Sequence, residues 1–166
     1  MKLKTQRGDT IEMTQKEIKE KLCIYISGPM TGYKNYNYPK FQKIAAALRA
    51  KGYKVLDPAS DIPPMLPGGK VISIDELHQM MDNGEISHKE AWRCFLRGDI
   101  VAVMTECNAI YNLKNHKASK GARFERTCNA RMDYPEFFEG GENDLLSPKE
   151  LANVYAELRK EEKLNK

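Results

Sequence analysis

The first third of the chain places an amphipathic helix between two strand-like apolar segments. Residues 22–27 form an unbroken run of strand-favouring residues that ends at Gly28-Pro29, a pattern typical of a buried parallel strand. Residues 39–52 predict a helix, because apolar residues recur at i, i+3, i+4 and i+7 and Gly52 supplies a stop. Residues 53–56 predict the next strand. This strand, helix and strand form a βαβ unit, so the sequence predicts an α/β fold with a parallel sheet.

The middle of the chain carries a long irregular segment before the pattern becomes regular again. Residues 61–90 are rich in proline and glycine and weakly periodic, which predicts a functional loop or lid. Ser87 and Glu90 have the spacing of a capping box that opens a helix. The apolar positions of that helix are Trp92, Leu96, Ile100 and Val103. Residues 109–113 predict the third strand.

The last part of the chain predicts two helices and one weak strand. Ser119 begins a helix that runs to about residue 132. Residues 134–138 make a poor fourth strand, because Pro135 interrupts them. Ser147 and Pro148 have the form of a helix start, so we expect a C-terminal helix that packs on the domain or on a second subunit.

These patterns divide the chain into three parts. Residues 1–20 are polar and charged and are interpreted as an N-terminal extension. Residues 21–138 form the α/β domain, with residues 61–90 as an insertion, and residues 139–166 form the C-terminal helix. A chain of 166 residues is long enough for one core without disulfides or a structural metal.

Composition excludes several classes of protein. No apolar run approaches the roughly 20 residues that cross a bilayer, so we expect no membrane span. The basic residues at the start are followed by no apolar stretch, so we expect no secretory signal and a cytoplasmic location. The net charge of +4 is small and spread along the chain, which argues against binding of polymeric nucleic acid. It is compatible with a small anionic ligand.

The cysteines and histidines show no metal-binding spacing. The four cysteines lie in apolar segments without a CxxC pair, and the three histidines lie far from zinc-finger offsets. We therefore expect buried thiols, no metal and no cofactor.

Parallel α/β sheets bind ligands beyond the carboxyl ends of their strands, so the segments that follow the strands are the places to search. They are residues 27–32, 57–60 and 114–121. Gly28 and Gly32 fit neither GxGxxG nor the P-loop spacing, so a tight turn is favoured over a phosphate loop.

Two acidic residues break the apolar pattern of their helices. Asp99 occupies a position in the stripe of its helix where an apolar side chain is expected, which predicts a half-buried carboxylate. Glu125 follows Phe124 and precedes Cys128 by three, and we take those two residues as the inner face of their helix. Each acid could instead be a buried cap or an ion-pair partner of Arg97, Arg123 or Arg126. Two such acids near one sheet edge favour a catalytic site.

Ser119 is a third candidate, because it begins a helix. A helix N-terminus offers free N–H donors and a partial positive charge, which together bind anions such as phosphate. An ordinary N-cap serine explains the residue equally well.

Five motifs resemble the nucleoside 2-deoxyribosyltransferase superfamily, most closely its small members carried by phages and bacteria. In chain order they are IYISGPMTG (24–32), DPA (57–59), Trp92 with RGDI (97–100), CNAIY (107–111) and SKGARFE (119–125). The resemblance implies a flavodoxin-like or Rossmann-like doubly wound parallel sheet in three α/β/α layers. It also implies a homodimer or higher homo-oligomer.

The resemblance further implies cleavage of the N-glycosidic bond of a 2'-deoxynucleoside 5'-monophosphate or nucleoside. The sugar would pass to water or to another base. Glu125 matches the nucleophile, Tyr25 a tyrosine that orients it, Asp99 a carboxylate near the leaving base, and Ser119 a phosphate-binding serine. A carboxylate nucleophile suits the positive charge that develops on the sugar, and no metal is needed.

With these assignments, the substrate is expected to contact residues of all three strand-end segments. They are Ser27, Gly28, Pro29, Met30, Gly32, Asp57, Ser119 and Gly121. The alternative is a non-catalytic nucleotide-binding module, although such a module has no need of Tyr25, Asp99 and Glu125 together.

Overall fold

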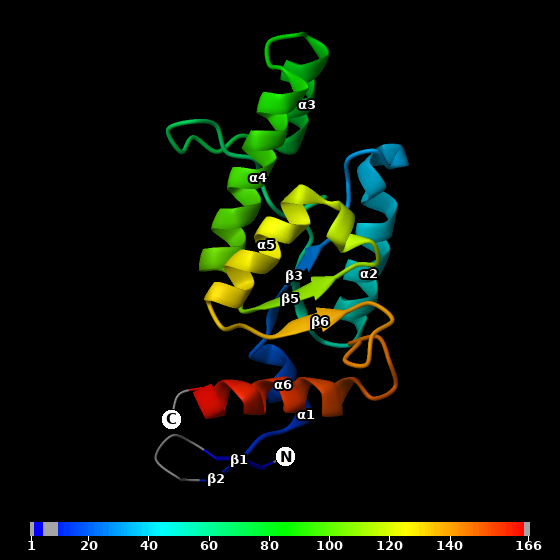
Figure 1. Ribbon diagram of the computed structural model, residues 1–166, viewed down its shortest axis with the longest axis vertical. Coiled ribbons are helices and arrows are strands. Elements are labelled where there is room, and N and C mark those ends of the chain that lie inside the picture. Colours follow the sequence, from blue (N-terminus) through cyan, green and yellow to red (C-terminus); the bar gives the residue numbers. More distant parts are fainter. Residues whose placement is uncertain (1, 5–9, 165–166) are drawn as a thin grey trace.

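A computed structural model describes residues 2–4 and 10–164 of the chain (Figure 1). Its centre is a parallel sheet of four strands in the order β4-β3-β5-β6. The strands are β3 (Cys23–Ser27), β4 (Lys54–Leu56), β5 (Ala109–Asn112) and β6 (Glu136–Phe138). Helices cover both faces, so the predicted three-layer, doubly wound α/β fold is confirmed.

The remaining elements surround this sheet. The helices are α1 (Gln15–Glu20), α2 (Tyr38–Ala50), α3 (Ile74–Asp82), α4 (His88–Thr105), α5 (Lys120–Arg131) and α6 (Glu150–Leu164), with the 3-10 turns η1 (Lys34–Asn37) and η2 (His116–Ala118). An antiparallel hairpin of β1 (Lys2–Lys4) and β2 (Thr10–Glu12) precedes α1. Within the described ranges, no helix is long and apolar enough to cross a membrane.

The central strand β3 directs its side chains alternately to the two faces of the sheet. Ile24 and Ile26 join the large core that contains the buried side of α2. Tyr25 joins the opposite cluster, which contains Val103 of α4. Because side chains two apart in a strand share a face, Ser27 lies on the same side as Tyr25. The strand therefore presents Tyr25 and Ser27 to the layer that contains α4 and α5.

The strand order places a topological switch point at the carboxyl ends of β3 and β5. These two strands pair in parallel, with Ser27 opposite Asn112. The chain leaves β3 through α2 to β4 on one side, and it leaves β5 through α5 to β6 on the other. Ligands of open α/β sheets bind at such a switch point, because the loops diverge there and leave a crevice.

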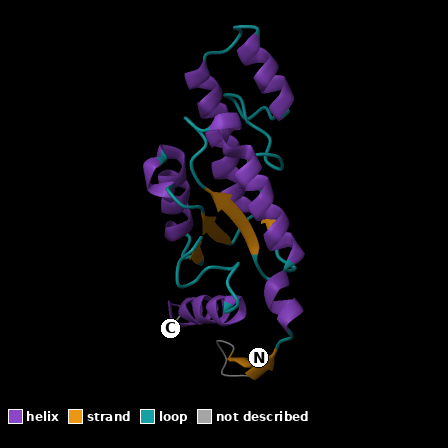
Figure 2. Cartoon of the chain, turned by 90° about the vertical axis from the view of Figure 1, so that its right-hand side faces the viewer, coloured by secondary structure: helices purple, strands orange, loops and turns teal. Residues whose placement is uncertain are grey.

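The predicted insertion extends this edge. Figure 2 shows helices projecting past the tips of the strands, and these are α3 and the first part of α4. They enclose a small apolar cluster that includes Ile72, Leu77 and Cys94. Gly98 lets α4 approach the loop closely, since a Cβ there would lie only 2.3 Å from the carbonyl oxygen of Pro63.

The inner face of α5 differs from the prediction. Phe124 was expected to point inward, but half of its surface is exposed. Ala122, Glu125 and Asn129 are buried instead, because the positions i, i+3 and i+7 of this helix face the sheet. Glu125 therefore occupies a core position rather than bordering one.

The ends of the chain pack on the face of the sheet opposite α4 and α5. Ile18 of α1 and Val154 of α6 are fully buried in the core that contains α2. α6 begins at Glu150, later than the predicted start at Ser147. The Glu150 carboxylate accepts hydrogen bonds from Lys19 Nζ and from the Tyr53 hydroxyl, each at 3.1 Å. The boundaries predicted for the N-terminal extension, the α/β domain and the C-terminal helix stay predictions. Residues 1, 5–9 and 165–166 lie outside the described residues.

Candidate functional site

A cavity of about 350 Å³ opens at the carboxyl edge of β3 and β5. This volume lies in the range of pockets that bind small molecules. The three residues predicted to be catalytic, Tyr25, Asp99 and Glu125, all line it. So do four of the predicted substrate-binding residues, which are Gly28, Met30, Ser119 and Gly121.

Glu125 is a buried acid of the cavity, and both oxygens of its carboxylate accept hydrogen bonds. It projects from the second turn of α5, and only 6% of its surface is exposed. The hydroxyl of Tyr25 donates a hydrogen bond to Oε1 at 2.8 Å, and the hydroxyl of Ser27 donates one to Oε2. Both donors come from β3, which presents them on the same face of the sheet. The carboxylate is thus held in one orientation by two strand side chains.

Burial decides the ionisation of Glu125. Removal from water raises its pKa to about 7, and the hydrogen bonds from Ser27 and Tyr25 partly oppose that rise. The pKa of the Tyr25 hydroxyl is raised as well, chiefly by burial and then by the charge of Asp99. Tyr25 therefore stays protonated and remains a hydrogen-bond donor to Glu125. Glu125 is therefore a buried carboxyl group that ionises near neutral pH.

Asp99 is the second acid of the cavity. It lies on α4 and is half-buried. Burial raises its pKa well above the usual range and the charge of Glu125 raises it further, whereas a hydrogen bond with Tyr25 opposes the shift. A protonated Asp99 beside an ionised Glu125 is the division of roles that acid-assisted nucleophilic chemistry requires.

Ser119 and Gly121 line the cavity near Glu125, at the start of α5. The Ser119 hydroxyl accepts a hydrogen bond from the backbone N–H of Ala122 at 3.2 Å, so it caps the helix while it lines the cavity. A Cβ at Gly121 would stand 4.0 Å from Oε1 of Glu125. The absence of a side chain at Gly121 leaves the carboxylate open to a ligand.

Four other predicted substrate-binding residues lie outside the lining of the cavity. Ser27 is fully buried behind Glu125, and Gly32 is an exposed turn residue with φ +86°. The buried Pro29 accepts a hydrogen bond on its carbonyl from the side-chain amide of Asn37 at 2.9 Å. Asp57 is also fully buried, and its carboxylate accepts hydrogen bonds from the N–H of Ala59 and the hydroxyl of Ser60, which stabilises the turn after β4.

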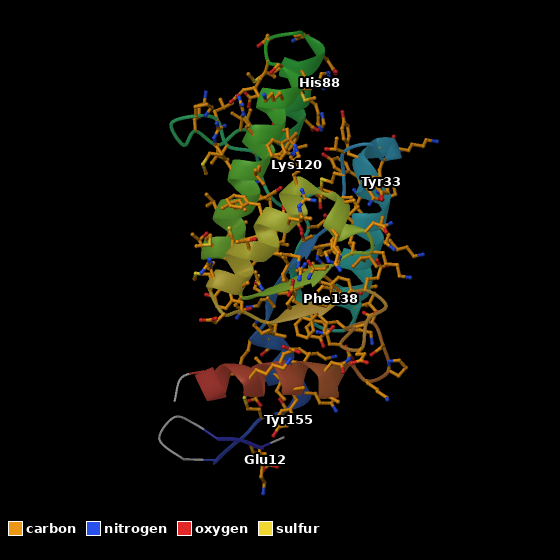
Figure 3. All side chains as sticks on the ribbon, viewed as in Figure 1. Glu12, Tyr33, His88, Lys120, Phe138 and Tyr155 are labelled. Atoms are coloured by element: carbon orange, nitrogen blue, oxygen red, sulfur yellow. The ribbon has the colours of Figure 1, made fainter. Side chains whose placement is uncertain are left out.

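The sequence reasoning missed the outer wall of the cavity. His78 of α3, together with His88 and Lys89 in the first turn of α4, lines it. Figure 3 shows His88 near the end of the molecule where α3 and α4 meet. The segment was predicted to be a lid, but its weak periodicity gave no indication of which side chains face inward. The three histidines were considered only as metal ligands.

The thiols do not form a metal centre or a disulfide in the described structure. Cys94 and Cys107 are buried, Cys23 and Cys128 are half-buried, and all four are free. Among residues 2–4 and 10–164, no group of three or more potential ligands is placed to hold a metal ion.

The comparisons with known proteins concern the same part of the chain. A search of the curated proteins found no match. The family described as Domain of unknown function (DUF4406) matches residues 22–134, a range that includes Tyr25, Asp99 and Glu125. This match covers more than half of the 166 residues. The chain therefore belongs to the DUF4406 family.

Proposed function

We propose that the protein cleaves the N-glycosidic bond of a 2'-deoxynucleoside 5'-monophosphate or nucleoside, either by hydrolysis or by transfer of deoxyribose to another base. The observation that carries the proposal is the buried Glu125 carboxylate, held on both oxygens by Tyr25 and Ser27, beside the second acid Asp99. The resemblance of residues 22–132 to the nucleoside 2-deoxyribosyltransferase superfamily supports the same reaction.

The reaction takes place in two displacements. An oxygen of ionised Glu125 attacks the anomeric carbon and forms a C–O bond, while the C–N bond breaks and its electron pair leaves with the base. Asp99 transfers its proton to the departing base. Water or a second base then attacks the anomeric carbon and releases Glu125, while Asp99 takes up the proton of the attacking group.

The start of α5 suits the phosphate of the substrate. Ser119 lines the cavity at the N-terminus of a 12-residue helix, where N–H groups and the helix dipole favour an anion. Gly121 keeps the path from this end to Glu125 open. The proposal therefore includes a 5'-phosphate bound near Ser119.

The homo-oligomer remains part of the proposal. Val101 and Met104 of α4 and Phe124 of α5 expose 42%, 40% and 50% of their surfaces. We expect these side chains to be covered in the oligomer, because large contiguous apolar patches mark contact surfaces between subunits. Light scattering coupled to size exclusion should give at least twice the mass of one chain, and a monomer at all concentrations would contradict this part.

Release of free base tests the proposed activity. The purified protein is incubated with each common deoxynucleoside and its 5'-monophosphate, and the products are separated by chromatography. At least one substrate should yield free base, either in water alone if the enzyme is a hydrolase, or after addition of an acceptor base, with formation of a new nucleoside, if it is a transferase.

Glu125→Gln keeps the size and polarity of the side chain but removes the nucleophile. We expect it to lower base release by several orders of magnitude. Glu142→Gln is the matched control, because Glu142 is exposed and outside the cavity. No base release from any substrate, or equal release by both variants, would overturn the proposed mechanism.

A further inference from the structure

Three aromatic rings from distant segments meet on the wall of the cavity. The ring centroids of Tyr36 in η1 and His78 in α3 are 6.0 Å apart, with the ring planes tilted by 39°. The centroids of His78 and Phe95 in α4 are 5.7 Å apart, with the planes tilted by 49°. All three residues line the cavity. Together they form a continuous aromatic wall to which no step of the proposed reaction assigns a role.

The backbone of Tyr36 is held in an unfavourable conformation to keep its ring at this place. Asn35, Tyr36 and Asn37 have φ values of 51°, 52° and 60°, which side-chain-bearing residues rarely adopt. The Asn37 amide bonds the carbonyl of Pro29 and so ties the segment to the turn after β3. Tyr36 is still 44% exposed, so burial in a core does not explain its position. An exposed ring held by strained backbone at a cavity is suited to contact a ligand.

The position of this wall relative to Asp99 indicates which part of the substrate it contacts. Phe95 and Asp99 lie one turn apart on α4, and both line the cavity, as does Trp92 one turn further. From Trp92 to Asp99 the helix rises roughly 10 Å. A base that receives its proton from Asp99 would therefore lie against Phe95 and extend toward the other two rings.

Polar atoms along the wall remain available to a ligand. His78 contributes two ring nitrogens, and its contacts with Tyr36 and Phe95 are ring contacts that leave these nitrogens without a hydrogen bond within residues 2–4 and 10–164. The ring of Tyr38 lies 5.9 Å from that of Tyr36, and its hydroxyl likewise has no hydrogen-bond partner within the described ranges. A planar base could stack on one of the rings while its edge meets these donors and acceptors.

We propose that Tyr36, His78 and Phe95 form the subsite for the leaving base and that this subsite prefers purines to pyrimidines. The assignment of the occupant rests on the proposed function. Because the three rings are tilted against each other by 39° and 49°, a base can stack face to face on only one of them. A two-ring base is long enough to stack on one ring and also contact the next, whereas a one-ring base contacts fewer rings, and base–aromatic stacking contributes to affinity.

Equilibrium binding to the Glu125→Gln variant tests the subsite without any need for turnover. Isothermal titration compares 2'-deoxyadenosine 5'-monophosphate with 2'-deoxycytidine 5'-monophosphate, which differ only in the base. We expect the adenine nucleotide to bind about tenfold more tightly. Equal affinities, tighter binding of the cytosine nucleotide, or no binding of either would overturn the proposal.

A pair of tyrosine variants in the same background locates the effect. Tyr36→Ala should weaken binding of the adenine nucleotide about tenfold, and the cytosine nucleotide less. Tyr33→Ala is the control, because Tyr33 is 43% exposed but is not among the residues that line the cavity. Equal effects of the two variants would exclude Tyr36 from the subsite.

The experiments distinguish failure of the proposed subsite from failure of the proposed activity. Purine-selective binding without base release by the native protein would retain the subsite and overturn the proposed function. Base release with no preference for purines, and with no effect of Tyr36→Ala on KM, would retain the function and overturn the subsite.

Discussion

The ionisation of Glu125 should govern how stability depends on pH. Its pKa is raised from an ordinary value of 4.5 to about 7, so the folded protein binds this proton more tightly than the unfolded chain does. The free energy of unfolding contributed by this group therefore falls as the pH rises from about 4.5 to about 7, and it stays low at higher pH. A pKa shift of this size corresponds to a loss of about 3 kcal/mol in the free energy of unfolding between low and high pH.

Glu125→Gln isolates this contribution. Glutamine resembles the protonated acid, and its amide can still accept from Tyr25 and donate to the hydroxyl of Ser27. We expect the variant to be about 3 kcal/mol more stable than the native protein at pH 8, and the two to agree within about 1 kcal/mol at pH 4.5.

Urea unfolding followed by circular dichroism at several pH values measures the difference. Glu142→Gln should follow the native protein at every pH, because its side chain is exposed. A constant difference between native protein and Glu125→Gln from pH 4.5 to pH 8 would refute the reasoning, because it would mean that burial does not perturb this carboxyl.

Two further predictions concern other parts of the fold. Gly98→Ala should lower the free energy of unfolding by about 1–3 kcal/mol in urea titrations, because the new methyl group meets the carbonyl of Pro63. The same change at an uncrowded helix position stabilises a protein. A more stable variant would show that the loop at Pro63 moves freely. Cys107→Ala should raise the pKa of Cys23 from about 7 toward its ordinary 9.0, because a hydrogen bond with Cys107 is the main cause of the lowering. The pH dependence of iodoacetamide labelling of Cys23 measures that shift. Cys107→Ser should restore part of the lowering of the Cys23 pKa. An unchanged pKa of labelling in Cys107→Ala would contradict the role given to the hydrogen bond with Cys107.

The sheet and the acids could be predicted because their signals are local. The apolar run at residues 22–27 and the helix that follows it define a βαβ unit, and the rule for ligand edges then indicates the ends of the strands. Asp99 and Glu125 were recognisable as acids at positions facing apolar surroundings. Ser27 could have been grouped with Tyr25 as a partner of Glu125, since residues two apart in a strand share a face.

The aromatic wall of the cavity could not be predicted because it depends on contacts between distant segments. The contacts of His78 with Tyr36 and Phe95 join three elements whose relative placement no local pattern encodes. The error at Phe124 has a related cause. An aromatic residue was assumed to face the core, whereas the packing of α5 on the sheet buries Glu125 and leaves Phe124 outside.

Trapping of the covalent intermediate tests the central claim most directly. A nucleotide with fluorine at the 2' position of the sugar destabilises the positively charged transition states and allows a glycosyl-enzyme to accumulate. Mass spectrometry of the intact protein and its peptides should then find one added fluorinated sugar 5-phosphate, attached to Glu125. Release of base without any adduct, or an adduct on a different residue, would contradict the account.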